Sequence, residues 1–242
     1  MRSVHKTMAS VAAIQTICSG MAKQYGPLFK RPCFTLYSSA QKKSLPTETD
    51  NATQISYVGN IGLGRAEQLA DIGKAMQSIN IPGLPNHIDV YSGEQRPELL
   101  ALMVPENGIR FHGSIPPDQV AQVYAGSIAA IHVETCDPVA VDRVRYSVST
   151  KIADLMSYGP CVLAYGPDDV ASVAYLAEEQ SAFIATNKEM LPQVLRNLLT
   201  DEKKRAEVLT NARNAAQKNH DPKKNIEQLR NWLQRTITDT GV

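Results

Sequence analysis

The chain alternates between short segments that are almost continuously apolar and longer segments whose apolar residues recur at helical spacing. Within 65–79, for example, Leu69, Ile72 and Met76 fall on one helical face. The apolar segments, which we predict to be strands, are 55–59, 87–93, 109–115, 128–134, 161–166 and 181–186. Apolar strands separated by helices are typical of a parallel sheet covered on both faces. We therefore predict an α/β fold, with a doubly wound parallel sheet of about six strands followed by C-terminal helices.

The two ends of the chain depart from this alternation. Residues 8–37 are predicted to form a strand or helix, then a helix, then a strand. The segment 38–54 is polar and rich in Ser, Thr and Lys, which is the composition of a linker or long loop. The last part of the chain is helical in pattern, with apolar stripes at 191–199 and 226–233.

The amino-acid composition argues against several classes of partner, namely nucleic acid, membranes and metal ions. The chain carries 25 basic and 24 acidic residues, so its charge gives no argument for binding nucleic acid or an acidic membrane surface. The 4 cysteines lack the spacing of a metal site and indicate free thiols in a reducing compartment. No run reaches the roughly 18 apolar residues of a membrane-spanning helix, and polar residues interrupt the N-terminal apolar run. We expect a soluble, cytoplasmic protein without a metal site.

Glycines follow the first strand of the predicted sheet, in the sequence GNIGLGR at 59–65. Such a loop lets the backbone approach a ligand closely, and the helix that begins there favours a phosphate. Arg65 could bind that phosphate through two N–H groups. A tight turn between strand and helix is the alternative. An NAD site is disfavoured, because the spacing is not G-x-G-x-x-G and no acidic residue follows at the required distance.

A second candidate is VRYSVSTKIADLMSYG at 144–159, where polar residues precede a buried strand. Good N-cap residues stand at the start of the helix predicted here, namely Ser147, Ser149 and Thr150. Lys151 adds a positive charge, and Asp154 lies about one turn later on the same face. A cation with a helix N-terminus suits a diphosphate, and a carboxylate suits the hydroxyls of a ribose. Taken alone, the residues favour the simpler alternative of a capped helix with a surface ion pair.

A third candidate is FHGSIPPDQV at 111–120. Its glycine and two prolines give a rigid backbone edge that could bind a nucleotide base, although a plain turn is the simpler interpretation. Three histidines lie in or near predicted strands without ligand spacing, and we expect them at core or edge positions: His87, His112 and His132. The chain has no G-x-S-x-G elbow and no P-loop.

Together and in this order, the segments resemble the C-terminal domain of GT-B-fold glycosyltransferases, the retaining, group 1 type that uses nucleotide sugars. The resemblance runs from about Ile55 to Asn219 and rests on ISYVGNIGLGR, IRFHGSIPPDQVAQVYAGSIAAIHV and STKIADLMSYGPCVLAYG. Residues 10–40 also resemble the last strand and helix of the family's N-terminal domain. The resemblance implies a Rossmann-like sheet that binds a nucleotide sugar.

The resemblance implies particular roles around the helix at 150–158. In the family, two glutamates separated by seven residues bracket a phosphate-binding turn, and the second contacts ribose. Asp154 occupies the second position, whereas Tyr146 stands at the first, so any role built on that first acid is in doubt. The backbone amides of the phosphate-binding turn would be those of Ser149, Thr150 and Lys151.

The other implied contacts come from the loops after two earlier strands. Gly59 and Asn60 begin the glycine loop, and Asn60 stands where the family usually has a basic residue. In the family a pair of basic residues follows the first strand, and Arg65 would be the one member of that pair present here. Ser114 and Ile115 would lie beside the base.

The function implied is transfer of a sugar from a UDP- or GDP-sugar to a saccharide or glycolipid acceptor, as in polysaccharide biosynthesis. The nucleotide sugar is a substrate, and no cofactor or metal is implied. Arg65 and Lys151 would stabilise the negative charge of the departing diphosphate. Peripheral contact with a membrane is compatible with a glycolipid acceptor.

The resemblance also implies a domain organisation. Residues 1–40 would be the tail of an N-terminal GT-B domain, 41–54 a linker, and 55–219 the nucleotide-sugar-binding domain. Residues 220–242 would form a helix that packs back toward the N-terminal half. We expect a fragment or one half of a split enzyme, which binds nucleotide but does not turn over without the acceptor domain.

Two other functions remain open from the sequence. One is a non-catalytic nucleotide-binding or interaction domain, which the missing acid at Tyr146 favours. The other is half of a nucleotide-sugar epimerase of the same fold.

Overall fold

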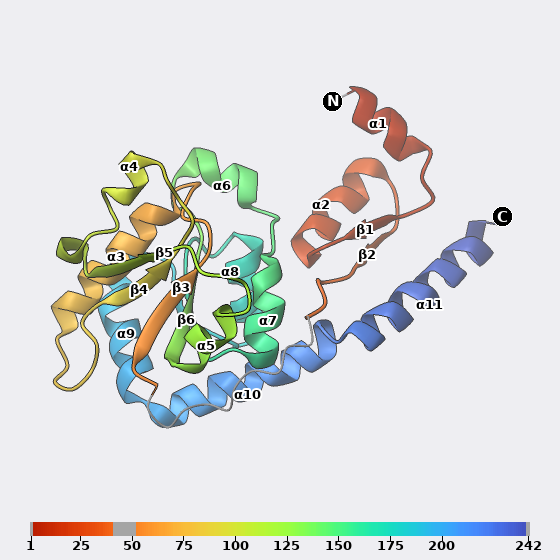
Figure 1. Ribbon diagram of the computed structural model, residues 1–242. Coiled ribbons are helices and arrows are strands. Elements are labelled where there is room, and N and C mark those ends of the chain that lie inside the picture. Colours follow the sequence, from red (N-terminus) through yellow and green to blue (C-terminus); the bar gives the residue numbers. More distant parts are fainter. Residues whose placement is uncertain (1, 41–51, 241–242) are drawn as a thin grey trace.

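The computed structural model describes residues 2–40 and 52–240. Its main feature is a parallel sheet of 6 strands in the order β5-β4-β3-β6-β7-β8 (Figure 1). The strands are β3 (Gln54–Val58), β4 (Ile88–Tyr91), β5 (Ile109–Gly113), β6 (Ser127–Val133), β7 (Cys161–Tyr165) and β8 (Phe183–Ala185). The predicted α/β fold, with a Rossmann-like sheet flanked by helices, is therefore confirmed.

Helices cover both faces of this sheet. Successive side chains of a strand point to opposite faces, and apolar residues of β6 on each face contribute to a separate apolar core. Ala129, Ile131 and Val133 of β6 belong to the core that holds α3 (Arg65–Ile79) and α9 (Leu191–Thr200). Ala130 belongs to the opposite core, together with residues of α7 (Thr150–Tyr158), α8 (Ala171–Glu178) and α10 (Glu202–Asn219). The remaining short helices of the main domain are α4 (Pro97–Leu100), η1 (Pro105–Asn107), α5 (Val120–Ala125), α6 (Pro138–Val144) and η2 (Lys188–Met190).

The strand order places a change of direction between β3 and β6. From β3 the chain moves outward through β4 to β5, and then returns to pair β6 with the free edge of β3. The loops after β3 and β6 therefore diverge, and a crevice forms at the carboxyl ends of these two strands. In open parallel sheets this is the usual place for a ligand.

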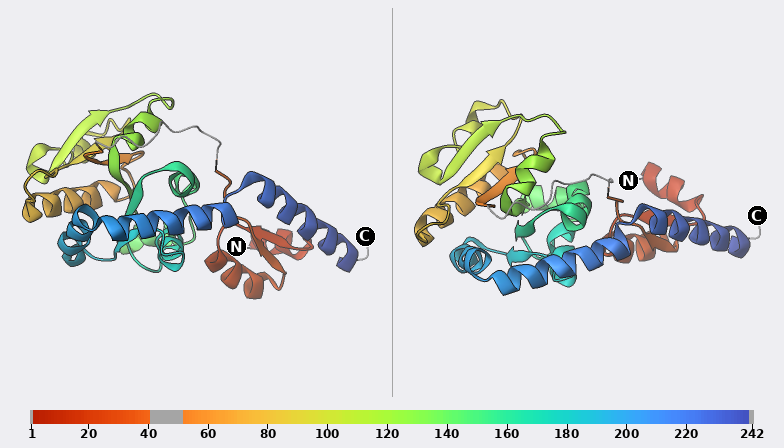
Figure 2. Two further views of the ribbon diagram at one scale, coloured as in Figure 1. Left: turned by 90° about the horizontal axis from the view of Figure 1, so that it is seen from below. Right: turned by 60° about the horizontal axis from the view of Figure 1, so that its bottom comes forward.

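Residues 2–37 form a small unit beside the main domain (Figures 1 and 2). It consists of α1 (Arg2–Ala9), β1 (Ile14–Thr16), α2 (Ser19–Phe29) and β2 (Cys33–Thr35), with β1 and β2 paired in parallel. The last helix, α11 (Pro222–Thr240), leaves the main domain and runs along this unit (Figures 1 and 2). The ring of Phe34 stacks on that of Trp232 with 5.1 Å between centroids.

Two further contacts hold the unit, one to α11 and one to the main domain. The side-chain amide of Asn225 donates to the carbonyl of Tyr37 over 3.1 Å. The thiol of Cys18 lies 3.5 Å from the carbonyl of Tyr146 and donates a hydrogen bond to it. The proposed domain boundaries at 40, 54 and 219 stay predictions, and residues 41–51 of the predicted linker lie outside the described residues.

No helix within 2–40 or 52–240 is both long enough and apolar enough to span a bilayer.

We predict that Trp232→Ala loosens residues 2–37 and leaves the main sheet unchanged. Stacked aromatic pairs stabilise by about 0.5–1.5 kcal/mol beyond their buried area, so amide hydrogen exchange in β1 and β2 should rise by at least about twofold. Leu233→Ala is the matched control, because Leu233 is 45% exposed. Equal exchange in the two variants would show that the aromatic stack does not hold the unit.

Candidate functional site

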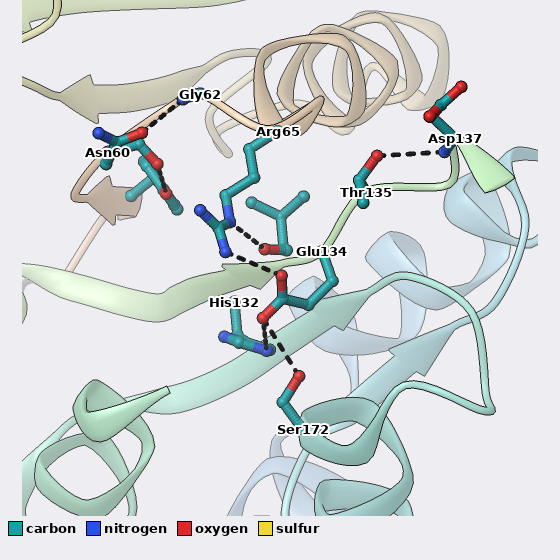
Figure 3. Close-up of polar contacts among 10 residues, drawn as sticks. Asn60, Gly62, Arg65, His132, Glu134, Thr135, Asp137 and Ser172 are labelled. Atoms are coloured by element: carbon teal, nitrogen blue, oxygen red, sulfur yellow. Dashed lines mark hydrogen bonds and ion pairs between the residues drawn. The ribbon is translucent and has the colours of Figure 1, made fainter. Parts of the chain in front are cut away.

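A cavity of about 100 Å³ lies at the carboxyl ends of β3 and β6, where the strand order reverses. Several of its polar residues are drawn in Figure 3. Its lining comprises Tyr57, Asn60, Arg65, Ile131, His132, Val133, Glu134, Ser149, Lys151 and Leu155. Four residues singled out in the sequence, from two separate motifs, therefore meet here: Asn60, Arg65, Ser149 and Lys151.

Lys151 reaches from the first turn of α7 across to β3. Its Nζ donates to the carbonyl of Val58 over 2.8 Å and lies 5.5 Å from the centroid of the Tyr57 ring. The residue as a whole is exposed, but its ammonium is partly desolvated, and this lowers the pKa of Lys151. The positive charge of Arg65 lowers it further, whereas Glu134 opposes the shift. An anion bound beside Lys151 would favour its charged form.

Gly59 makes the position of this ammonium possible. Its φ of +154° is one that side-chain-bearing residues rarely adopt. A Cβ at Gly59 would lie only 1.9 Å from Nζ of Lys151, so any larger residue would displace the lysine head group. The first glycine of the loop is therefore required for the placement of Lys151.

Arg65 is held by a carboxylate that the sequence reasoning missed. Its guanidinium NH2 donates to Glu134 Oε2 over 3.0 Å, and its Nε donates to the carbonyl of Val133 over 3.2 Å (Figure 3). The Glu134 side chain is 3% exposed and also accepts a hydrogen bond from Ser172 on α8 over 3.3 Å. This buried carboxylate fixes the direction of the guanidinium at the mouth of the crevice.

His132 lies on the same face of β6 as Glu134, as two residues apart on a strand must. Its Nε2 is 3.6 Å from Glu134 Oε1 and has no hydrogen-bond partner among the described residues (Figure 3). Burial lowers the pKa of His132 to about 4, and the charges of Arg65 and Lys151 lower it too, against the opposing effect of Glu134. The expected core histidine is thus buried and neutral at pH 7, but it also lines the cavity.

The glycine loop is shaped by its own side chains. Asn60 Oδ1 accepts a hydrogen bond from the amide of Gly62 over 2.6 Å, and the carbonyl of Asn60 accepts one from the Tyr57 hydroxyl over 2.6 Å. Asn60 therefore fixes the turn through its side-chain oxygen.

The start of α7 lacks a side-chain cap. Ser149 is the N-cap residue, but its side chain makes no capping hydrogen bond, and Thr150 begins the helix. The first N–H groups of a helix have no partner within the helix and carry a partial positive charge. They lie beside Lys151 at the edge of the same cavity, which is an arrangement suited to an anion.

Sequence comparison assigns the chain to a family. Residues 72–231, more than half of the chain, match the family model described as glycosyl transferase-like. The chain belongs to this glycosyl transferase-like family. A search of curated protein sequences gave no match.

Solved structures show that this glycosyl transferase-like chain has the fold of a GT-B half, which confirms the resemblance seen in the sequence. HepE from Anabaena, in complex with UDP-glucose, matches with a TM-score of 0.70 and 16% identity over 97% of this chain and 67% of HepE. A TarM variant from S. aureus, in complex with UDP, fondaparinux and alpha-GlcNAc-glycerol, matches with a TM-score of 0.71 and 10% identity. That match covers 97% of this chain and 46% of TarM.

WaaG, a glycosyltransferase involved in lipopolysaccharide biosynthesis, matches with a TM-score of 0.61 and 15% identity over 84% of this chain and 58% of WaaG. The glycosyl transferase-like chain thus spans about half the length of TarM and WaaG.

The other residues implied by the family resemblance lie outside the cavity lining. Asp154 is half-buried one turn beyond Lys151, close enough to Tyr124 for its charge to add to the raised pKa of that phenol, which comes mainly from burial and next from Tyr57. Ser114 and Ile115 follow β5 at the edge of the sheet, two strands from β3. Whether any of these residues contacts a nucleotide stays a prediction.

Tyr146, at the position of the family's first glutamate, faces the small N-terminal unit. Its ring lies 6.5 Å from that of Tyr25, centroid to centroid, and within about 3.5 Å of the place that a Cβ on Gly20 would occupy. The glycosyl transferase-like chain therefore uses this position for packing.

The described part of the chain contains no group of three or more His, Cys, Asp or Glu side chains arranged to hold a metal ion.

We predict that His132 makes the stability of the fold depend on pH. Between pH 6.5 and about 4 the unfolded chain binds a proton at this histidine that the folded chain does not, so the free energy of unfolding falls as pH decreases. The fall attributable to His132 should reach about 3 kcal/mol. Urea unfolding of wild type and of His132→Gln across this pH range measures the effect. The free energy of unfolding should fall less in the variant than in wild type. Parallel curves would show that His132 titrates normally.

Proposed function

We propose that this domain binds the diphosphate of a UDP- or GDP-sugar in the 100 Å³ cavity and serves as the donor half of a metal-independent glycosyltransferase. The observation that carries the proposal is the convergence of Lys151, Arg65 and the start of α7 on one cavity at the reversal of strand order. Two cations and a set of backbone N–H groups supply the donors that a diphosphate needs.

The same groups would stabilise the reaction. As the bond between sugar and phosphate breaks, negative charge grows on the departing diphosphate. Lys151 and Arg65 lie where they could stabilise this charge, in place of a metal ion. A guanidinium has five N–H donors, and the two used by Arg65 toward Val133 and Glu134 leave others for phosphate oxygens.

Glu134 also lines this cavity and supports the arrangement through Arg65. A carboxylate next to a phosphate site would repel the ligand if it were exposed. Its ion pair with Arg65 and its hydrogen bond from Ser172 keep Glu134 compensated and buried. We propose that it positions Arg65 before the nucleotide arrives.

The nucleoside would extend from the diphosphate across the carboxyl edge of the sheet. Asp154, one turn along α7, is proposed to accept hydrogen bonds from ribose hydroxyls. Ser114 and Ile115, at the end of β5, are proposed to lie beside the base. The structure of HepE contains UDP-glucose and that of TarM contains UDP, so UDP is the first nucleotide to test, with GDP as the alternative.

The acceptor is proposed to be a saccharide or glycolipid bound mainly by the other half of a GT-B enzyme. The matched structures are longer than this chain, and residues 2–37 are proposed to be the last part of that other half, with α11 packed along them. We therefore expect nucleotide binding by this domain, and transfer only when the other half is present.

The first prediction from this proposal concerns Lys151. UDP or GDP should raise the melting temperature of the wild type, and Lys151→Ala should weaken binding by about tenfold or more, since a charged hydrogen bond contributes roughly 1.5–3 kcal/mol. Lys203→Ala, an exposed lysine on α10, is the matched control. Equal binding by both variants would remove Lys151 from the site, and no binding of either nucleotide to wild type would argue against the proposed function.

The second prediction concerns Asp154. If its carboxylate accepts a hydrogen bond from the ribose 2′-hydroxyl, Asp154→Ala should weaken binding of UDP more than binding of 2′-deoxy-UDP, by several-fold. Isothermal titration of both nucleotides against both proteins measures this coupling. A loss of affinity that is the same for the two nucleotides would mean that Asp154 acts elsewhere.

A further inference from the structure

His132 is a buried imidazole in the cavity that holds Lys151, and packing does not explain its presence there. Its side chain is 8% exposed, and its Nε2 has no hydrogen-bond partner among the described residues. Buried polar atoms nearly always have a partner, and an unpaired one destabilises the fold. The strand does not need a polar residue on this face, since Ala130 lies there in an apolar core. The imidazole therefore indicates a function in the cavity.

The charges that line the cavity do not balance those of a bound diphosphate. Arg65 and Lys151 each contribute a positive charge and Glu134 contributes a negative one, so a single positive charge remains. In a nucleotide sugar each of the two phosphates carries a negative charge near neutral pH. Binding would therefore leave one negative charge uncompensated in a partly desolvated place, which is unfavourable.

Among the described residues that line the cavity, His132 is the side chain that can gain a positive charge. Tyr57 cannot, because a neutral phenol only loses a proton, and burial raises its pKa to about 12. Burial also lowers the pKa of His132 to about 4, and the two cations lower it further against the effect of Glu134, so the imidazole is neutral before a ligand binds. A diphosphate would offset the two cations and favour the protonated form.

Glu134 offers the acceptor for the added proton. Its Oε1 lies 3.6 Å from Nε2 of His132, slightly beyond hydrogen-bond distance, while its Oε2 accepts from Arg65 over 3.0 Å (Figure 3). Its other neighbour, Ser172 on α8, is a neutral hydroxyl. Phosphate oxygens on the guanidinium would weaken the compensation of this carboxylate. A small movement would let a protonated His132 restore it through a charged N–H···O hydrogen bond.

We propose that His132 takes up a proton from solvent when a nucleotide sugar binds, and that the imidazolium compensates the added negative charge through Glu134. The identity of the ligand rests on the proposed function. His132 is a positioning residue in this scheme, because it acts on the diphosphate through Glu134 and Arg65. Donor binding becomes stronger as pH falls, although the same acidification destabilises the fold.

Calorimetry with the whole chain measures the proton uptake. UDP-glucose is the probe, because its diphosphate, unlike the terminal phosphate of UDP, does not titrate near neutral pH. Titrations in two buffers with different ionisation enthalpies give the protons taken up per ligand bound, between roughly pH 5 and 7.5. His132→Gln removes the titrating group and keeps a polar side chain. His87→Gln is the matched control, since burial lowers the pKa of His87 too, but this residue lies outside the cavity lining.

Wild type and His87→Gln should take up a proton on binding, and their affinity for UDP-glucose should rise by up to about tenfold for each pH unit of acidification. In His132→Gln both the uptake and the rise should be smaller. Equal uptake by all three proteins would overturn the proposal, as would the absence of uptake by wild type.

NMR of the wild type gives a second measurement that does not depend on the folding of a variant. The chain has 5 histidines, and the ring signals of His132 can be assigned through its bonds to the backbone. UDP-glucose should move the midpoint of their titration to higher pH by about one pH unit or more. An unchanged midpoint would overturn the proposal. If wild type bound no UDP-glucose at any pH, the proposed function itself would fail, and this inference with it.

Discussion

The arrangement of the site depends on a carboxylate that is buried at the end of the central strand. Desolvating a charge is costly unless it is paired and hydrogen-bonded, and Glu134 obtains both from neighbouring elements, through Arg65 on α3 and Ser172 on α8. Three elements are therefore locked together at the point where the strand order reverses. Both members of the ion pair line the cavity that also holds Lys151.

Much of the fold could be predicted from the sequence, because strands buried on both faces leave continuous apolar segments that are easily recognised. The same continuity of apolar residues made Glu134 hard to recognise as a functional residue. Glu134 ends the apolar segment 128–134 and was read as part of that strand, and His132 was read as an ordinary core residue. Alternation along β6 was the missed signal, because Ala130, His132 and Glu134 share a face that changes from apolar to polar toward the carboxyl end of the strand.

Lys151 was recognised from its motif, but the reason for its placement is tertiary. Its contact with the carbonyl of Val58 joins residues 93 positions apart, and the clearance it needs comes from Gly59. Helix α6 was missed because it is short, although Asp137 and Pro138 are an ordinary helix start. The cavity that holds Lys151 could not be predicted, since it depends on how loops from different strands approach one another.

The stack of Phe34 on Trp232 has a practical consequence. The chain has 1 tryptophan, and it lies at the seam between residues 2–37 and the helix that extends from the main domain. Indole emission shifts to longer wavelength when the ring becomes hydrated. Tryptophan emission of the unlabelled protein, excited at a wavelength that tyrosine does not absorb, therefore reports on that one seam, and it can follow separation of the two parts without signal from the tyrosines of the main sheet.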